Sequence, residues 1–247
     1  IAHEQWKRLL ETIVSELQGQ VQKACCSPGS RWHWDYSSYV LEACVSVLGP
    51  KNYMFILREL EGHVAAAAVH HSGCRVLQRI VEHAGWEDDL TTPLLQELLP
   101  NLKAISLNCY GNYVLQKWLE QASQSQIDAI GEELLELSRR SSNDIADMVQ
   151  NKYGSNVIEK AVKHASGGLQ QCLVQMLRRN LAKQGRMGKL LKNSGYGSFV
   201  FKILQKDYPA DDVGAGLREP HPPAASDASC PRRSQQQEEE EQQEQQE

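Results

Sequence analysis

The chain has 247 residues, a hydrophobic fraction of 41% and a formal net charge of −5. This length suits one large domain, or a short repeat array followed by a tail. The longest run of small apolar residues, 64–69, is far too short to span a bilayer, so no membrane segment is expected. Because the chain begins at Ile1 within a helical pattern, we expect a fragment of a longer protein.

Helical segments follow one another along residues 1–210. Apolar residues recur at helical spacing, no alternating strand pattern stands out, and glycine and proline fall at segment ends. Residues 9–26 predict the last helix of an earlier, truncated repeat, and residues 26–34 predict an insertion after it. Residues 53–69 and 90–107 each predict the third helix of one repeat followed by the first helix of the next.

The C-terminal segment 211–247 differs from the rest of the chain in composition. It is rich in Gln and Glu and carries ten acidic and three basic residues, a net charge of −7, which leaves +2 for residues 1–210. With almost no apolar residues, it cannot bury enough surface to fold, so we predict a disordered tail. A solvating role is the default expectation, and an interaction role is the alternative.

Cysteine and histidine usage bears on compartment and chemistry. The seven cysteines have irregular spacing and form no C-x-x-C, which favours free thiols in a reducing compartment, and we expect a cytoplasmic protein. Four loosely clustered histidines lack zinc-site spacing, so we predict capping and surface roles and no metal or cofactor. No catalytic constellation has a meaningful spacing, so no enzyme is expected. The histidines are His63, His70, His71 and His83.

A motif recurs along the chain. In residues 108–120, NCYGNYVLQKWLE, the side chains of Val114, Leu115, Trp118 and Leu119 are spaced as the buried stripe of a helix. Four relatives align with this segment at steps of 36, 38, 43 and 43 residues, which is typical of a helical solenoid with three helices per repeat. The relatives are WDYSSYVLEACVSVL, HHSGCRVLQRIVEHA, NKYGSNVIEKAVKHA and SGYGSFVFKILQKD.

Three positions of this motif carry polar or flat side chains. The first and fifth positions lie one helical turn apart and share a face, which we predict to be the non-core side, and stacked repeats would align them in rows. The flat groups at the second position can stack on bases, worth roughly 1–3 kcal/mol per base. The first position holds Ser38, Cys74, Asn112, Ser155 and Ser198. The second holds Tyr39, Arg75, Tyr113, Asn156 and Phe199. The fifth holds Glu42, Gln78, Gln116, Glu159 and Lys202.

The first and fifth positions match the edges of unstacked bases. Guanine offers two adjacent donors, which suit the acceptor-only carboxylate of Glu159, with the serine of its pair assisting. Uracil alternates acceptor and donor, which suits the two amides of Asn112 and Gln116. Adenine offers an acceptor and an amine, which Gln78 can serve while the small Cys74 leaves room.

The helices GCRVLQRIVEH, YGNYVLQKWLE and YGSNVIEKAVKHAS resemble the recognition helices of Pumilio (PUF) repeats. They are similar to the fifth, sixth and seventh repeats of an eight-repeat domain, and the resemblance covers about residues 1–208. It implies an all-α fold, a right-handed α-solenoid of three-helix repeats over residues 1–210. About four to five repeats are expected, with the first one truncated.

The resemblance also implies site roles. In this family each repeat reads one base of a single-stranded RNA that runs antiparallel to the protein. The resemblance gives 5′-N-G-U-A-3′, which is compatible with the UGUA core of the family. The implied readers are Ser155/Glu159 for G, Asn112/Gln116 for U and Cys74/Gln78 for A, with Asn156, Tyr113 and Arg75 as stacking residues.

The last motif departs from the family pattern. It has Ser198, Phe199 and Lys202, where the family usually has Asn, Tyr and Gln. Lys202 cannot accept a hydrogen bond, so phosphate attraction is expected in place of uracil readout. The closing helices that the resemblance implies are not found after Tyr208, so we expect a truncated or unusual gene product.

The first motif departs as well. Its pair Ser38 and Glu42 predicts guanine readout beside the flat Tyr39. However, Ser37 replaces the usual glycine and an insertion precedes the helix. Contact of this repeat with RNA is therefore left open.

Three functions are compatible with these patterns. The first is sequence-specific binding of a UGUA-like element in mRNA 3′ untranslated regions, with control of translation or mRNA stability by recruited protein effectors of repression or decay; a monomer is expected. The second is a ribosome-biogenesis role with RNA binding that ignores sequence, which the mild charge of residues 1–210 disfavours. The third is a helical-repeat scaffold for protein interactions.

Overall fold

The computed structural model describes residues 12–26, 35–48, 50–84 and 88–183, with residues 196, 200 and 204. The chain divides into two units, residues 1–209 and 210–247, and all described residues belong to the first. The predicted reader residues of the last motif and the predicted tail lie outside the described residues. They are Ser198, Phe199, Lys202 and residues 211–247.

From residue 21 to residue 183 the described residues form four units of three helices, a helical segment at residues 12–17 precedes them, and the described part of the chain contains no strand. The first unit consists of α2 (Val21–Cys26), α3 (Asp35–Val47) and α4 (Pro50–Leu60). The second consists of α5 (Val64–Ala68), α6 (Gly73–Ala84) and α7 (Asp88–Leu98), which the 3₁₀ turn η1 (Leu99–Asn101) follows. The third consists of α8 (Leu102–Leu107), α9 (Gly111–Gln121) and α10 (Gln124–Arg140). The fourth consists of α11 (Ser142–Gln150), α12 (Gly154–His164) and α13 (Gly167–Lys183).

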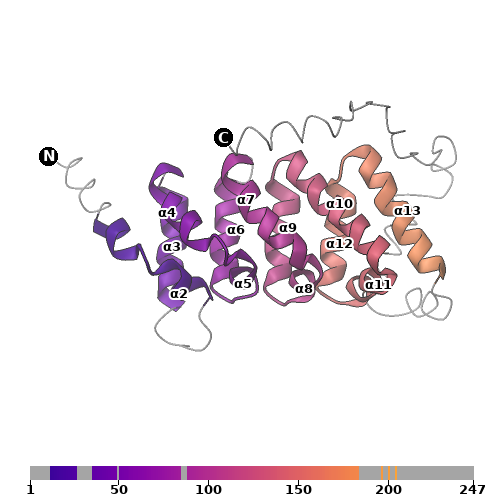
Figure 1. Cartoon of the computed structure of the whole chain (residues 1–247), viewed down its shortest axis with the longest axis horizontal. Helices are drawn as coiled ribbons and strands as arrows, with labels where there is room; N and C mark the ends of the chain where they lie inside the picture. The colour runs from indigo at the N-terminus through magenta and orange to yellow at the C-terminus, as the bar shows by residue number, and fades with distance from the viewer. Residues whose placement is uncertain are drawn as a thin grey trace, which may run out of the picture. The chain divides into compact units, whose positions relative to one another are not determined.

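Equivalent helices of successive units lie side by side (Figure 1). The second helices of the units, α3, α6, α9 and α12, each contact the next in order, and we call them the inner helices. The third helices α7, α10 and α13 form a second row, and the short first helices lie along one edge of the stack. This all-helical stack is the α-solenoid expected from the repeated motif.

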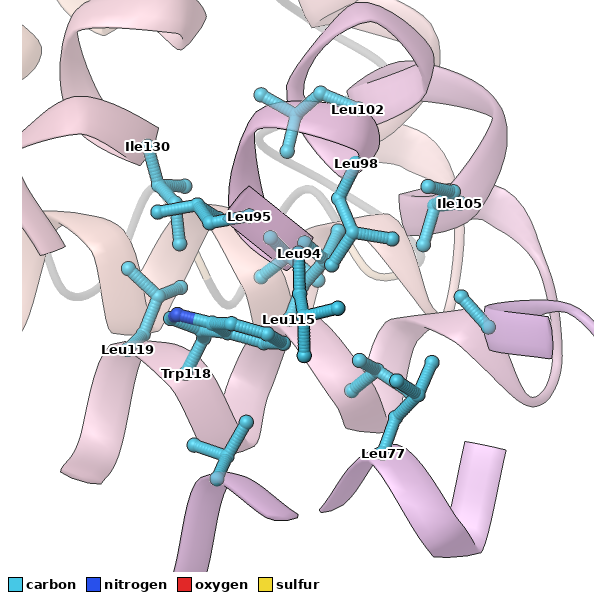
Figure 2. Close-up of a cluster of buried hydrophobic side chains, with 14 of the residues drawn as sticks. Leu77, Leu94, Leu95, Leu98, Leu102, Ile105, Leu115, Trp118, Leu119 and Ile130 are labelled. Carbon is cyan, nitrogen blue, oxygen red and sulfur yellow. The ribbon is translucent and has the colours of Figure 1, made fainter. Parts of the chain in front are cut away.

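The core runs between these rows (Figure 2). The predicted stripe of α9 is confirmed, because Val114, Leu115, Trp118 and Leu119 are each 0% exposed. Their neighbours come from helices on every side, including Leu98 of α7. Full burial of such a side chain stabilises the fold by roughly 1.5–3 kcal/mol. Each unit therefore depends on its neighbours for part of its core.

The glycines before the first motif position are required by close packing. Gly73, Gly111 and Gly154 begin three of the inner helices. A Cβ on Gly111 would lie 2.8 Å from the carbonyl oxygen of Ile105, and one on Gly154 would lie 2.7 Å from that of Met148. The backbone of the short helix therefore leaves no room for a side chain where each of these inner helices begins.

The prediction of a single helix over residues 9–26 is wrong. Residues 12–17 are helical, but a turn follows and Gly19 has a φ of 76°. The Glu59 carboxylate of α4 accepts hydrogen bonds from the N–H groups of Gly19, at 2.7 Å, and Val21, at 3.1 Å. These bonds satisfy the free N–H groups where α2 begins. Since α2 packs on α3 and α4, it is the first helix of the next unit.

The predicted insertion lies within a unit and not between two units. Because α2 ends at Cys26 and α3 begins at Asp35, the insertion lies between the first and second helices of one unit, outside the described residues. The next unit begins with the same carboxylate contact. There Glu97 accepts from the N–H groups of Gly62, at 2.6 Å, and Val64, at 3.2 Å.

Among the described residues, none of the helices combines the length and apolarity needed to cross a membrane. The same residues contain no group of three or more His, Cys, Asp or Glu side chains that could hold a metal ion. All six described cysteines are free thiols. The Nδ1 of His70 accepts from the N–H groups of Ser72, at 3.3 Å, and Gly73, at 3.4 Å, which confirms the capping role predicted for that histidine.

Candidate nucleic-acid interface

The first-position residues of the motif are more buried than predicted. Ser38, Cys74, Asn112 and Ser155 are 0%, 4%, 1% and 5% exposed, respectively. Their placement on an open, non-core side was therefore wrong. The inner helices contact one another directly, and these side chains are buried on them. The second position is exposed at Tyr39, Tyr113 and Asn156 and half-buried at Arg75, and the fifth is half-buried.

On α9 the two amides are joined. Nδ2 of Asn112 donates to the carbonyl oxygen of Asn108 at 2.8 Å, and Nε2 of Gln116 donates to Oδ1 of Asn112, also at 2.8 Å. Nε2 of Gln116 carries a second hydrogen, and Oε1 of Gln116 is an acceptor. The half-buried Gln116 can therefore offer a donor and an acceptor together, while the buried Asn112 holds it in place. Tyr113 lies beside it and is 54% exposed.

On α6 the pair is smaller. Burial raises the pKa of the Cys74 thiol to about 11, so the group is protonated and neutral at pH 7. Its Sγ lies 3.4 Å from the carbonyl oxygen of His71. Nε2 of Gln78 donates to the carbonyl oxygen of Cys74 at 2.9 Å. The Gln78 amide is thereby held in place with its carbonyl oxygen and a second N–H available.

On α12 the fifth position is an open carboxylate. Glu159 is half-buried and has no hydrogen-bond or ion-pair partner within the described ranges. Ser155 lies one turn before it. Asn156 is exposed, and its Nδ2 donates to the carbonyl oxygen of Lys152 at 3.1 Å. A half-buried carboxylate of this kind accepts strong hydrogen bonds from the donor edge of a base that excludes water from it.

On α3 the three predicted residues all contact one side chain of the next unit. Nη1 of Arg75 donates to the Tyr39 hydroxyl at 3.0 Å, and Nη2 donates to Oγ of Ser38 at 3.2 Å. Nε of Arg75 lies 3.6 Å from Oε1 of Glu42. The guanidinium carbon also lies 4.6 Å from the centroid of the Tyr39 ring. Arg75, predicted to stack on a base, is thus bound to the preceding motif.

An open groove of about 510 Å³ brings predicted residues of α3, α6 and α9 together. Two of its lining residues, His71 and Tyr110, were missed by the sequence analysis, and their ring centroids are 6.4 Å apart. A signal for Tyr110 exists, because an aromatic residue also precedes the motif glycine at Tyr153 and Tyr196. The lining residues are Tyr39, His71, Cys74, Arg75, Gln78, Tyr110 and Tyr113.

The turns into two inner helices share an asparagine that the sequence analysis also missed. Oδ1 of Asn108 accepts from the N–H groups two and three residues further on, at 2.8 and 3.0 Å. Asn151 makes the same two contacts at 2.8 and 3.2 Å. Because the Asn108 carbonyl also holds the Asn112 side chain, this turn orients the reader amide directly.

Ion pairs tie neighbouring inner helices together. Lys117 of α9 pairs with Glu82 of α6 at 2.8 Å, and Lys160 of α12 pairs with Glu120 of α9. The hydrogen bond from Lys160 holds the pKa of the Glu120 carboxyl below its usual value, against the opposing effect of burial. Both pairs occupy equivalent motif positions. They therefore fix the register between inner helices, on which the alignment of the reader rows depends.

Stacked three-helix units with aligned polar and flat residues define an α-helical repeat protein. A model described as "Pumilio-family RNA binding repeat" matches residues 63–99, 101–135 and 144–178. These segments correspond to the second, third and fourth units of the structure. The three matched segments are therefore Pumilio-family repeats, and the described part of the chain has the Pumilio fold.

Curated relatives are similar over much of this chain. "Pumilio homology domain family member 4" of Saccharomyces cerevisiae is 27% identical over 177 residues, which is 69% of this chain and 19% of the relative. "Putative pumilio homolog 13" of Arabidopsis thaliana is 27% identical over 143 residues, 58% of this chain and 26% of the relative. The chain thus spans about a fifth to a quarter of the length of these relatives.

Solved structures share the fold. PUF-8 in complex with PBE-RNA superposes with a TM-score of 0.66 at 18% identity, covering 82% of this chain and 53% of that one. The Puf3 RNA-binding domain bound to a Cox17 RNA 3′ UTR recognition sequence gives a TM-score of 0.62 at 19% identity, covering 83% and 55%. The chain therefore spans about half the length of these domains.

Proposed function

We propose that this chain binds single-stranded RNA along its inner helices and reads a UGUA-like element. The observation that carries the proposal is a triad that recurs on α6, α9 and α12. In each triad a buried first-position residue lies one turn from a half-buried polar one, with a flat side chain beside them that is exposed on α9 and α12 and half-buried on α6. Because these helices lie side by side, the triads follow one another along one surface.

The hydrogen-bonding groups of each first- and fifth-position pair match the edge of one base. On α9 the available amide groups alternate donor and acceptor, as the uracil edge does. The unpartnered Glu159 carboxylate suits the two donors of guanine. On α6 the carbonyl oxygen and second N–H of Gln78 suit the amine and ring acceptor of adenine.

The names of the similar structures support the class of ligand. The matched PUF-8 and Puf3 structures are complexes with RNA, and the Puf3 ligand is described as a 3′ UTR recognition sequence. We therefore propose that this chain binds mRNA 3′ untranslated regions and regulates translation or mRNA stability through recruited protein effectors. We propose that it does so as a monomer in the cytoplasm, where free thiols such as the six described ones persist.

A binding measurement tests the proposal. Fluorescence anisotropy of the full chain with labelled UGUA RNA is compared with the same RNA carrying ACUA. Two base changes at roughly 1–3 kcal/mol each are expected to weaken binding at least tenfold. Equal affinity for the two RNAs with a steep salt dependence would favour binding through the phosphate backbone of the RNA, as in the ribosome-biogenesis alternative. Absence of any RNA binding would favour the scaffold alternative.

A further inference from the structure

Two inner helices carry the same Ser/Glu pair, but the surroundings of the pairs differ. On α12 the carboxylate of Glu159 has no polar partner in the described part of the chain. On α3 the carboxylate of Glu42 faces Nε of Arg75 at 3.6 Å. The same base-reading chemistry is therefore open in one unit and occupied in another.

Arg75 occupies the whole α3 triad. Its two terminal nitrogens donate to the Tyr39 hydroxyl at 3.0 Å and to Oγ of Ser38 at 3.2 Å. Nε of Arg75 and Oε1 of Glu42 are shielded from solvent and have no hydrogen-bond partner among the described residues. Each charge is thus compensated mainly by the other, and removing one partner from such a pair is costly. The contact is therefore expected to persist in solution.

The stacking face of Tyr39 is covered as well. The guanidinium carbon of Arg75 lies 4.6 Å from the ring centroid. A base inserted between two flat groups needs van der Waals contact on both faces, a separation of roughly 7 Å in total. No base fits between these groups while Arg75 holds this position.

The contact is particular to arginine at this motif position. The corresponding residues of the next two units are Tyr113 and Asn156. The Tyr113 ring is 54% exposed, and the Asn156 amide bonds to a carbonyl of its own unit. Among the described residues, neither bonds to the fifth-position side chain of the preceding unit. The structure thus contains two open arrangements beside the closed one.

We propose that Arg75 is a specificity-determining residue that withdraws Ser38 and Glu42 from base recognition. The RNA base that faces α3 is then not read, although its Ser/Glu pair matches the guanine pair of α12. In RNA running antiparallel to the protein, this base is X in 5′-UGUAX-3′. The inference rests on the proposed RNA-binding function and sets the 3′ limit of its readout.

Affinities for RNAs with each of the four bases at X test the inference. The wild-type chain is expected to bind them within about twofold of one another. Arg75→Tyr and Arg75→Asn install the residues of the next two units, and each is expected to gain a guanine preference of at least about tenfold. Tyr113→Asn alters the equivalent position one unit further along and is the matched control, expected to leave X unread.

A combined variant shows which group does the reading. Adding Glu42→Gln to Arg75→Tyr removes the carboxylate acceptor and is expected to abolish the acquired guanine preference. A wild-type chain that already prefers guanine at X, or Arg75 variants that remain indifferent, would overturn the inference. Failure of the underlying function is seen separately, as equal wild-type binding of UGUAX and ACUAX. Two replacements at this half-buried position guard against misfolding of one variant, and thermal unfolding followed by circular dichroism checks both.

Discussion

Nε2 of Gln116 donates a hydrogen bond to Oδ1 of Asn112 at 2.8 Å, so the two amides of α9 form one polar unit. The Asn112 amide is held in turn by the carbonyl oxygen of Asn108 at 2.8 Å. A base that meets this pair meets groups whose orientation is already set. Preorganisation of this kind reduces the entropy lost on binding.

Replacing both amides tests their assignment to uracil. Asn112→Ala combined with Gln116→Ala is expected to remove discrimination at the third base of UGUA, worth about 1–3 kcal/mol. The measurement is the affinity for RNAs with each base at that position. Preferences at the neighbouring guanine and adenine are expected to remain, because their readers lie on other helices. Loss of all three preferences together would instead indicate a damaged fold.

Transplanting a pair tests whether the readers are modular. Asn112→Ser with Gln116→Glu reproduces the α12 pair Ser155 and Glu159 on α9. Since a carboxylate only accepts hydrogen bonds, we expect the preference at the third base to move from uracil to guanine. Retention of uracil preference in this variant would contradict the assigned role of the pair.

Gly111→Ala tests the packing at the entry to an inner helix. The new Cβ would lie 2.8 Å from the carbonyl oxygen of Ile105 and 2.8 Å from its Cγ2. The carbonyl oxygen belongs to the backbone and cannot rotate away. We expect a loss of about 1–3 kcal/mol in the free energy of unfolding, measured by urea denaturation. Gly168→Ala in α13 is the control, because a Cβ there meets nothing within 4 Å. That variant is expected to be neutral or slightly stabilising.

A buried polar network joins the second and third units. Nε1 of Trp118 donates to Oε1 of Gln126 at 2.7 Å, and Nε2 of Gln126 donates to Oγ1 of Thr91 at 2.8 Å. Gln126→Leu would strand the buried indole N–H, and an unsatisfied group of this kind costs about 1–3 kcal/mol. We expect a corresponding drop in unfolding free energy by urea titration.

A double-mutant cycle isolates this contact. Trp118→Phe removes the indole donor, so Gln126→Leu is expected to cost less in that background than in the wild type. Equal costs in the two backgrounds would show that Gln126 stabilises the fold without the Trp118 hydrogen bond.

The Glu120–Lys160 pair predicts a dependence of stability on pH. The hydrogen bond from Lys160 lowers the pKa of the folded-state Glu120 carboxyl. Its stabilising effect is therefore present above the unfolded-state pKa and is lost as pH falls through the lowered, folded-state value. We expect Glu120→Gln to reduce the loss of unfolding free energy between about pH 6 and pH 3. The difference is expected to be under about 1 kcal/mol, since the carboxylate is partly exposed.

Urea titrations at several pH values provide the measurement. The control is Glu132→Gln, which alters an exposed carboxylate of α10 that has no ion pair in the described part of the chain. A pH profile that Glu120→Gln and Glu132→Gln change equally would argue against a specific role for the pair.

Features within one helix were predictable from the sequence. The stripe of Val114, Leu115, Trp118 and Leu119 follows from helical spacing, and its burial was confirmed. The repeat comparison also predicted a stack of three-helix units, because the same motif returned at near-constant intervals. By contrast, the break at Gly19 was missed, since the apolar spacing continues across a turn that a distant carboxylate stabilises.

The sequence by itself determined which side chains each motif carries and how they are spaced along a helix, since that spacing is a property of the backbone. Only the tertiary structure decided what surrounds them. It buried the first-position residues, and it brought Arg75 onto Ser38, 37 residues earlier in the chain. Contacts of this kind depend on how separate helices pack. Two identical Ser/Glu pairs therefore lie in one open and one occupied environment.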